Sequence, residues 1–285
     1  MTASSPGPLV SQSWLEEHLD DPGVVVVEVA FHPPGSPAST PGGHVPGAQI
    51  RWWKELCWHE TDRRFPDAAT MARRLEDMGV SDATTLALVG DPLQFGTYAY
   101  WVLTLTGLDH LAVVVDGGRP TWLAEGRPTT EEPPPPARRG RVTAGDEDHS
   151  SRVGRDEILD GLGRPDRVLV DLRSDEEYRG ERVSPITAPY DHGAERAGHI
   201  PGARNLPRDR LLDDSGRFLP AAEIRACLES VGAGEGKDVI TYCRLSHRAS
   251  LGWFAATRLA GREGIRVYDG SWTEWGSIVG VPIER

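Results

Sequence analysis

Apolar runs alternate along the chain with amphipathic segments. Val24–Val29 is a β-branched run interrupted only by Glu28, which is typical of a strand buried on both faces. Asp67–Met78 places its apolar residues on one side of a predicted helix. Further strands are predicted at Thr85–Val89, Ala112–Val115, Val168–Leu172, Asp238–Tyr242 and Ile265–Tyr268, and further helices at Tyr98–Leu105, Ala221–Val231 and Ala249–Leu259. Strands that alternate with helices predict an α/β fold with parallel sheets flanked by helices.

The chain repeats itself. The segment Gly-His-Val-Pro-Gly-Ala at residues 43–48 recurs as Gly-His-Ile-Pro-Gly-Ala at residues 198–203. Further along, positions 153 residues apart match without a gap, as Leu75 matches Leu228 and Trp122 matches Trp275. Motif order, spacing and the tryptophan position agree, which predicts two tandem copies of one α/β domain.

The composition between the copies changes at residues 127–151. This stretch holds four consecutive prolines (133–136), then a short arginine cluster, and it has no pattern that could form a core. We therefore predict a first domain over residues 9–126, a solvated Pro-rich linker over 127–151, and a second domain over 152–285. A chain of 285 residues is long enough for two domains.

The charge balance excludes some classes of partner. The formal net charge is −12, which argues against non-specific nucleic-acid binding, although a small site can be locally basic. The N-terminus shows no secretory signal, and the longest largely apolar run, Val24–Ala30, is too short to span a bilayer. We expect a cytoplasmic protein without membrane or nucleic-acid partners. Three separated cysteines form neither a disulfide framework nor a zinc pattern, so no metal is expected.

The candidate chemistry lies at Cys243, between a buried strand and a helix. The segment reads Tyr-Cys-Arg-Leu-Ser-His-Arg-Ala over residues 242–249. Ligands of parallel α/β sheets bind beyond the carboxyl ends of strands, where the amides of a helix N-terminus point at an anion. Two arginines and a histidine beside the cysteine favour the thiolate, which is the nucleophilic form. Cys57 and Cys227 lack such a basic cluster and are interpreted as packing residues.

The sequence resembles the rhodanese family, specifically the two-domain thiosulfate/3-mercaptopyruvate sulfurtransferases. The resemblance rests on Val-Asp-Leu-Arg at 170–173, both Gly-His-x-Pro-Gly-Ala segments, Tyr-Cys-Arg at 242–244 and Asp-Gly-Ser-Trp-Thr-Glu-Trp at 269–275. It implies that Cys243 is the catalytic residue. The candidate substrate-binding residues are Arg244, Leu245, Ser246, His247 and Arg248 of the loop, with Arg182 and Arg196 outside it; Asp171 and His199 are expected to give structural support.

The internal alignment indicates that the first copy is catalytically inactive. Gly90 falls opposite Cys243, and Phe95 falls opposite Arg248. The loop over residues 90–95 has no nucleophile, and Asp91 replaces a positive charge. The resemblance implies the same division, with the second domain catalytic.

The sequence departs from the family pattern at two places. Glu177 stands before Tyr178, where better known thiosulfate enzymes carry an arginine, and a carboxylate there is expected to repel a carboxylate substrate. The loop Cys-Arg-Leu-Ser-His-Arg is also bulkier than the Gly-containing loops of typical mercaptopyruvate enzymes.

The expected activity is sulfur transfer from thiosulfate, a small anionic donor, to a thiophilic acceptor such as cyanide, through a cysteine persulfide and without a cofactor. A 3-mercaptopyruvate sulfurtransferase and a non-catalytic rhodanese-like binding module are the alternatives. A phosphatase of related fold is disfavoured, because those enzymes place five residues between cysteine and arginine, whereas four separate Cys243 from Arg248.

Overall fold

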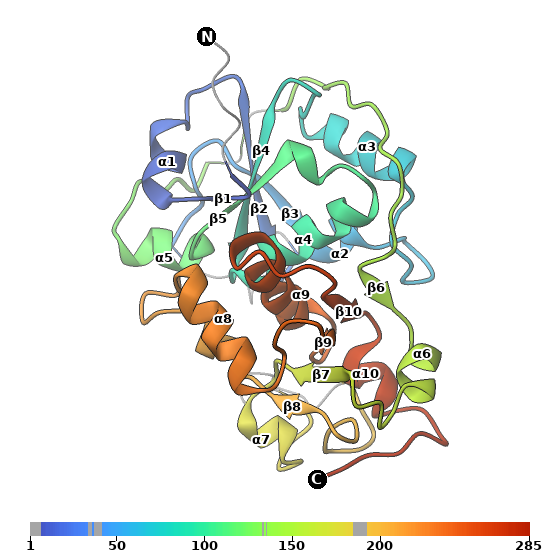
Figure 1. Ribbon diagram of the computed structural model, residues 1–285. Coiled ribbons are helices and arrows are strands. Elements are labelled where there is room, and N and C mark those ends of the chain that lie inside the picture. The colour runs from blue at the N-terminus through green and yellow to red at the C-terminus, as the bar shows by residue number, and fades with distance from the viewer. Residues whose placement is uncertain (1–6, 34–35, 37–41, 133, 135, 185–192) are drawn as a thin grey trace. The chain divides into compact units, whose positions relative to one another are not determined.

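The computed structural model describes residues 7–33, 36, 42–132, 134, 136–184 and 193–285. The chain divides into two compact units, Met1–Asp148 with Ser215–Arg217, and His149–Asp214 with Phe218–Arg285. Each unit contains one five-stranded sheet, and all the strand pairs within it are parallel (Figure 1). The α/β fold of two tandem copies is therefore confirmed.

The first unit has the strand order β1-β5-β4-β2-β3. Its elements are β1 (Leu9–Val10), α1 (Gln12–Glu17), β2 (Val24–Ala30), β3 (Gln49–Trp52), α2 (Trp53–Cys57), α3 (Ala68–Asp77), β4 (Thr85–Asp91), α4 (Gln94–Leu105), η1 (Asp109–Leu111), β5 (Ala112–Val115) and α5 (Gly118–Ala124). In Figure 1, α1 and α5 lie on one side of the strands, and α2, α3 and α4 lie on the other. The apolar strands are thereby covered on both faces.

The second unit has the matching order β6-β10-β9-β7-β8. Its elements are β6 (Arg152–Val153), α6 (Arg155–Asp160), β7 (Arg167–Asp171), α7 (Asp175–Tyr178), β8 (Arg204–Asn205), η2 (Arg208–Leu211), α8 (Ala221–Ser230), β9 (Asp238–Tyr242), α9 (His247–Phe254), η3 (Ala255–Leu259), β10 (Arg266–Tyr268) and α10 (Ser271–Trp275). Because β9 is the central strand, the turn that follows it lies in the middle of the carboxyl edge of the sheet.

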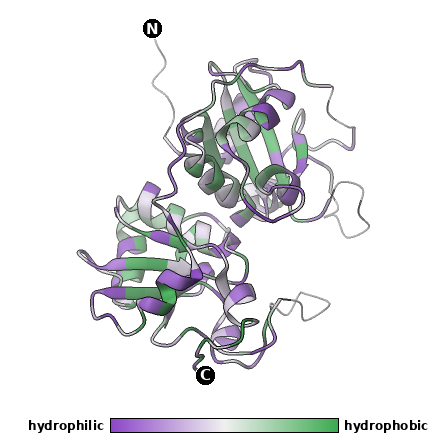
Figure 2. Ribbon diagram, turned by 90° about the vertical axis from the view of Figure 1, so that its right-hand side faces the viewer, coloured by the Kyte–Doolittle hydropathy of each residue, from purple (hydrophilic) through white to green (hydrophobic). Residues whose placement is uncertain are grey.

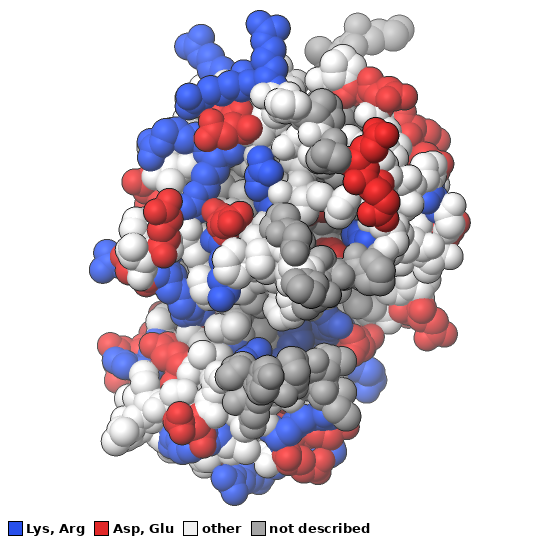
Figure 3. All heavy atoms as spheres, turned by 180° about the vertical axis from the view of Figure 1, so that it is seen from behind, with Lys and Arg blue, Asp and Glu red and all other residues white. Residues whose placement is uncertain are grey.

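The cores follow the apolar pattern of the strands. Figure 2 shows hydrophobic residues concentrated in the sheets and hydrophilic residues on the outer helices. Trp122 in the first unit and Trp275 in the second are completely buried, at matching positions of the repeat. On the face shown in Figure 3, acidic and basic side chains are interspersed. No described helix is long and apolar enough to cross a membrane.

The segment predicted to be a solvated linker is instead attached to the first unit over part of its length. The Gly140 amide donates to the Glu76 carbonyl at 2.9 Å, and the Val142 amide donates to the Glu76 carboxylate at 3.2 Å. Further on, the Asp148 amide donates to the Leu105 carbonyl at 3.1 Å. These hydrogen bonds satisfy backbone amides that would bond to water in a solvated coil. The Pro-rich composition of the segment did not indicate this attachment.

Candidate active site

Cys243 directly follows the central strand β9 of the second unit and is 1% exposed. Its amide donates to the Ser271 hydroxyl at 3.2 Å, and its carbonyl accepts from the Trp272 amide at 2.9 Å. Both partners lie in the segment that follows β10, the neighbouring strand. Two adjacent strand ends thus fix the backbone of the cysteine.

The turn between Cys243 and α9 contains an unusual backbone conformation at Ser246. This residue has φ 70° and ψ −13°, in the left-handed region that favours glycine. Its hydroxyl donates to the Asp269 carbonyl at 2.6 Å, and its own carbonyl accepts from the Ser250 amide at 2.7 Å. Strained turns of this kind persist where surrounding bonds over-determine them, and they cluster at functional sites.

Arg248 is paired with a carboxylate from another element. Its Nη1 and Nη2 atoms donate to the two carboxylate oxygens of Glu177 on α7, at 2.6 and 2.9 Å. Glu177 is fully buried. Burial alone would raise the pKa of Glu177, but the hydrogen bonds and charge of Arg248 hold it below its ordinary value. The sequence analysis assigned the positive charge of Arg248 to substrate binding. In the structure this charge is paired with the Glu177 carboxylate.

The other predicted binding residues of the loop lie in the same turn. Arg244 and Leu245 are half-buried and His247 is buried. The Arg244 carbonyl accepts from the Thr273 amide at 3.1 Å. The loop therefore brings the cysteine and its basic neighbours together at one point of the sheet edge.

The two arginines predicted outside the loop are engaged elsewhere. Arg182 forms an ion pair with Glu176 at 3.0 Å. Arg196 donates to four backbone carbonyls of the C-terminal segment, at 2.8 to 3.2 Å; these belong to Trp275, Gly276, Ile278 and Val281. Arg196 thus anchors that segment through all of its guanidinium nitrogens. The predicted contact between Arg196 and the substrate stays a prediction, and these hydrogen bonds do not support it.

Asp171 and Arg173 form a buried ion pair behind the turn. Both side chains are 0% exposed, and Arg173 Nη2 lies 2.6 Å from the Asp171 carboxylate. The same nitrogen donates to the Gly198 carbonyl at 2.7 Å. The guanidinium also lies over the Trp272 ring, 4.5 Å from its centroid. This arrangement ties the end of β7 to the Gly-His-Ile-Pro-Gly segment. The supporting role of Asp171 stays a prediction, which these contacts favour.

His199 holds a turn through several contacts. Its ring stacks on Tyr178 at 3.8 Å between centroids, and its Nδ1 lies 2.8 Å from the Tyr178 carbonyl. Its backbone exchanges two hydrogen bonds with Glu284, at 2.8 and 2.9 Å. The structural role of His199 stays a prediction, and these contacts favour it.

Sequence reasoning missed Arg208, which begins η2. Burial lowers the pKa of Arg208 and the charge of Arg248 lowers it further, whereas Asp209 and Cys243 raise it. The Arg208 amide donates to the Leu172 carbonyl at 3.3 Å, so η2 begins beside the end of β7. Strand β8 was not predicted, and this strand is the signal that would have placed Arg208 at the same sheet edge as Cys243.

The other two cysteines lie in different surroundings. Cys57 is completely buried in α2, and burial strongly raises the pKa of its thiol. Cys227 lies on α8 with its Sγ atom 3.3 Å from the Arg210 carbonyl. Cys57 is the last residue of α2 and Cys227 lies within α8, so neither lies in a turn between a strand and a helix, as Cys243 does.

The counterpart of the cysteine turn in the first unit has no space for a nucleophile. A Cβ atom on Gly90 would lie 2.5 Å from the Leu93 carbonyl oxygen and 2.6 Å from the Gly96 amide nitrogen. Asp91, the next residue, lies 3.2 Å from the guanidinium of Arg119. A cysteine at position 90 would require the backbone of this turn to move.

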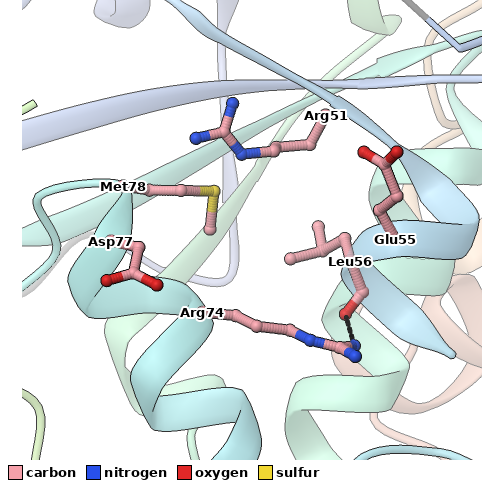
Figure 4. Close-up of a pocket in the computed structure, with 6 residues that line it drawn as sticks. All are labelled: Arg51, Glu55, Leu56, Arg74, Asp77 and Met78. Carbon is pink, nitrogen blue, oxygen red and sulfur yellow. Dashed lines mark hydrogen bonds between the residues drawn. The ribbon is translucent and has the colours of Figure 1, made fainter. Parts of the chain in front are cut away.

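The first unit also has a small hollow of about 150 Å³ on its surface (Figure 4). Its lining residues are Arg51, Glu55, Leu56, Arg74, Asp77 and Met78. Arg74 donates to the Leu56 carbonyl at 2.9 Å. Charges of both signs line this hollow, and none of the predicted site residues does. Among the described residues, no cluster of three or more His, Cys, Asp or Glu side chains could hold a metal ion.

Comparison with known proteins agrees with this geometry. The family model described as a rhodanese-like domain matches residues 155–278. The sulfur carrier protein TtuD of Thermus thermophilus is 40% identical and covers 100% of this chain and 99% of its own length. A protein of Saccharopolyspora erythraea named "Putative thiosulfate sulfurtransferase" is 37% identical over 97% of this chain and 96% of its own.

A solved structure shows the same fold over nearly the whole chain. SseA from Escherichia coli, described as a 3-mercaptopyruvate sulfotransferase, superposes with a TM-score of 0.73 at 22% identity over 94% of this chain and 99% of its own. Fold and matches together define a tandem rhodanese-fold protein. The chain belongs to the family of two-domain rhodanese-like sulfurtransferases.

Proposed function

We propose that this chain is a thiosulfate sulfurtransferase that moves a sulfane sulfur to a thiophilic acceptor, such as cyanide, through a persulfide on Cys243. The observation that carries the proposal is the position of Cys243 at the carboxyl edge of the central strand, in a turn fixed by Ser271 and Asp269. The relative from Saccharopolyspora erythraea, whose name contains thiosulfate sulfurtransferase, supports this choice of donor.

The proposed reaction proceeds in two balanced steps. In the first, the Cys243 thiolate attacks the outer sulfur of thiosulfate, so that a new sulfur–sulfur bond forms while the bond to the sulfonate sulfur breaks. Sulfite leaves with the bonding electron pair, and the persulfide retains the negative charge. In the second step, the acceptor attacks the outer persulfide sulfur. Cyanide becomes thiocyanate, and the Cys243 thiolate is regenerated.

The division of labour between the two units is part of the proposal. The second unit holds the nucleophile. The first unit is catalytically inactive, which the close contacts around Gly90 support. We further propose that the protein works in the cytoplasm, because a catalytic thiol needs reducing surroundings, and the three cysteines are free.

A second candidate function differs in the acceptor. TtuD of Thermus thermophilus is named a sulfur carrier protein, and it is 40% identical over its full length. On this alternative, the Cys243 persulfide passes its sulfur to a protein thiol instead of a small acceptor. The donor half-reaction is the same in both cases.

One experiment tests the shared intermediate. Protein incubated with thiosulfate and then digested should contain a Cys243 peptide heavier by the mass of one sulfur atom, and cyanide should remove this addition while thiocyanate appears. The Cys57 and Cys227 peptides of the same digest serve as internal controls. If thiosulfate is consumed while the Cys243 peptide never gains sulfur, the proposal is wrong.

A further inference from the structure

Backbone strain in the second unit is concentrated beside Cys243. Among the described residues of this unit, only two that are not glycine have a positive φ, Ser246 at 70° and Ser271 at 51°. Ser271 accepts the hydrogen bond of the Cys243 amide, and Ser246 lies in the turn that follows the cysteine. A left-handed conformation is unfavourable for a residue with a Cβ atom, and it persists only where other contacts hold it. Contacts of the turn must therefore hold Ser246.

The side chain of Ser246 makes such a contact. Ser246 is completely buried, and its hydroxyl oxygen lies 2.6 Å from the carbonyl oxygen of Asp269 and 3.2 Å from its carboxylate. Asp269 directly follows β10, and its carboxylate also pairs with Arg152 of β6 at 3.0 Å. A hydroxyl has one hydrogen to donate, and Asp269 accepts it here. The Ser246 side chain thus ties the cysteine turn to the end of the neighbouring strand.

The first unit lacks this hydrogen bond at the matching place of the repeat. Leu93 aligns with Ser246, has no hydroxyl and adopts the right-handed conformation, with φ −40° and ψ −42°. Asp116 aligns with Asp269, but its carbonyl accepts from the side-chain amide of Gln12 at 2.6 Å. The left-handed residue and its hydrogen bond therefore occur together, in the copy that has the cysteine.

The conformation of Ser246 sets the direction of the amides around it. Among the described residues, the backbone amides of Leu245, Ser246 and Arg248 donate to no protein acceptor. Successive amides that flank a left-handed residue at the start of a helix form a concave site for an anion. Buried amides in folded proteins are normally paired. Three neighbouring amides without a protein acceptor are therefore available to an anion at Cys243.

We propose that Ser246 is a positioning residue, whose hydrogen bond to Asp269 keeps the turn in the conformation that directs these amides at the sulfur bound to Cys243. The inference rests on the proposed function for the identity of that sulfur, the outer atom of the persulfide. It changes the role that the sequence analysis gave to Ser246, from a substrate contact to a residue that orients the backbone.

Two substitutions separate an orienting role from a direct contact with the donor. Ser246→Ala and Ser246→Gly both remove the hydroxyl, but only glycine adopts the left-handed conformation without a steric cost. We expect kcat/KM for thiosulfate to fall roughly 10-fold in Ser246→Ala, as the cost of a left-handed residue predicts, and clearly less in Ser246→Gly. Equal losses in the two variants would mean that the hydroxyl contacts the donor, and wild-type rates in both would mean that the hydrogen bond has no role. Either result would overturn the inference.

Ser250→Ala is the matched control. Ser250 is also completely buried, lies on α9, and donates its hydroxyl to the His247 carbonyl at 2.8 Å. This variant should keep kcat/KM near the wild-type value. A loss as large as that in Ser246→Ala would count against the inference, because any lost hydroxyl in this helix would then have the same effect. All variants are assayed at a temperature at which circular dichroism shows them folded.

A second readout does not need thiosulfate. The rate at which Cys243 is alkylated is measured by peptide mass spectrometry with iodoacetate, an anion, and with iodoacetamide, which is neutral. Amides directed at the cysteine favour the anionic reagent, so the ratio of the two rates should fall severalfold in Ser246→Ala, less in Ser246→Gly, and not in Ser250→Ala. This pattern would support the orienting role even if thiosulfate is not the donor. An unchanged ratio in Ser246→Ala would refute that role, whatever the donor.

Discussion

The guanidinium of Arg248 and the carboxylate of Glu177 form a two-point ion pair, with oxygen–nitrogen distances of 2.6 and 2.9 Å, and Glu177 is fully buried. Glu177 occupies the position where the sequence departs from better known thiosulfate enzymes, and a repulsive effect on carboxylate substrates was expected from it. The pairing changes that expectation, because Arg248 neutralises the charge. Glu177 instead anchors the helix that begins after the cysteine turn.

The pair predicts a large loss of stability for Glu177→Ala. Removing the carboxylate leaves the Arg248 guanidinium largely buried without a counter-charge, and breaking a buried pair on one side costs about 3–5 kcal/mol. The free energy of unfolding is measured by urea denaturation. Glu176→Ala, which removes an exposed ion pair with Arg182, is the matched control and should have a much smaller effect. Comparable losses in the two variants would contradict the prediction.

The double variant of this pair gives a sharper result. Glu177→Ala combined with Arg248→Ala removes both charges, so it leaves no unpaired buried ion. Its loss of stability should be smaller than the sum of the two single losses, by the coupling energy of the pair. A strictly additive result would mean that the two side chains do not stabilise each other.

The same pair predicts a pH dependence of stability. The pKa of Glu177 in the folded chain is lowered: burial opposes this, but Arg248, Arg173 and the Ser174 amide outweigh burial. A lowered folded pKa contributes stability above the ordinary Glu pKa of about 4.3, and this contribution is lost as the pH falls through the folded pKa. The difference in unfolding free energy between the wild type and Glu177→Gln should thus be largest at about pH 6 and shrink toward about pH 3. A difference that stays constant over this range would argue against a paired carboxylate.

Replacing Cys243 should abolish sulfur transfer. Cys243→Ser retains the shape of the side chain, but the hydroxyl is not a thiolate, so no persulfide can form. Cys57→Ser and Cys227→Ser are the controls and should keep most of the activity, because both residues lie in helices and not in the turn that follows the central strand β9. The measurement is cyanide-dependent thiocyanate formation. Activity that survives in Cys243→Ser would assign the chemistry to another residue.

Much of the fold was predictable because the central strands are continuous and apolar. The bounds of β5 and β9 agree with the prediction to the residue. Strands β1 and β6 are two residues long, too short to produce a periodic pattern. Helix α4 begins at Gln94, four residues before its predicted start, because its first turn packs against the Gly90 turn. Such packing is set by tertiary contacts and leaves no local signal.

The sequence could predict only those site residues that are adjacent to one another in the chain. Cys243 and the loop residues up to Arg248 are adjacent in the chain, so any fold that forms the turn brings them together. Glu177 and Ser271 join them through strand order, which a single sequence does not specify.

In each unit an arginine donates to the carbonyl of the first glycine of the Gly-His-x-Pro-Gly motif, but the two arginines come from different elements. In the first unit Arg119, on α5, donates through Nε at 3.0 Å to the Gly43 carbonyl. In the second unit Arg173, directly beyond β7, donates to the matching Gly198 carbonyl. In the repeat Arg119 aligns with Trp272, so the two arginines reach matching carbonyls from positions that do not correspond in the alignment.

The last prediction concerns the donor: thiosulfate should be preferred over 3-mercaptopyruvate. Thiosulfate is a compact dianion, and its sulfonate end must be held while its outer sulfur meets the Cys243 thiolate. Arg244 and His247 lie in the turn beside Cys243, where α9 begins, so positive charge is concentrated near the cysteine. The carboxylate of 3-mercaptopyruvate lies farther from its sulfur and would need an arginine outside the loop, yet Arg182 is paired with Glu176.

The preference is measured as kcat/KM for both donors with one acceptor. A tenfold advantage for thiosulfate corresponds to about 1.4 kcal/mol of transition-state binding, less than one charge-assisted hydrogen bond can supply. Arg182→Ala should leave the thiosulfate rate unchanged. If 3-mercaptopyruvate is the better donor and Arg182→Ala removes its advantage, then the outer arginine decides specificity and the loop-centred account of donor binding is wrong.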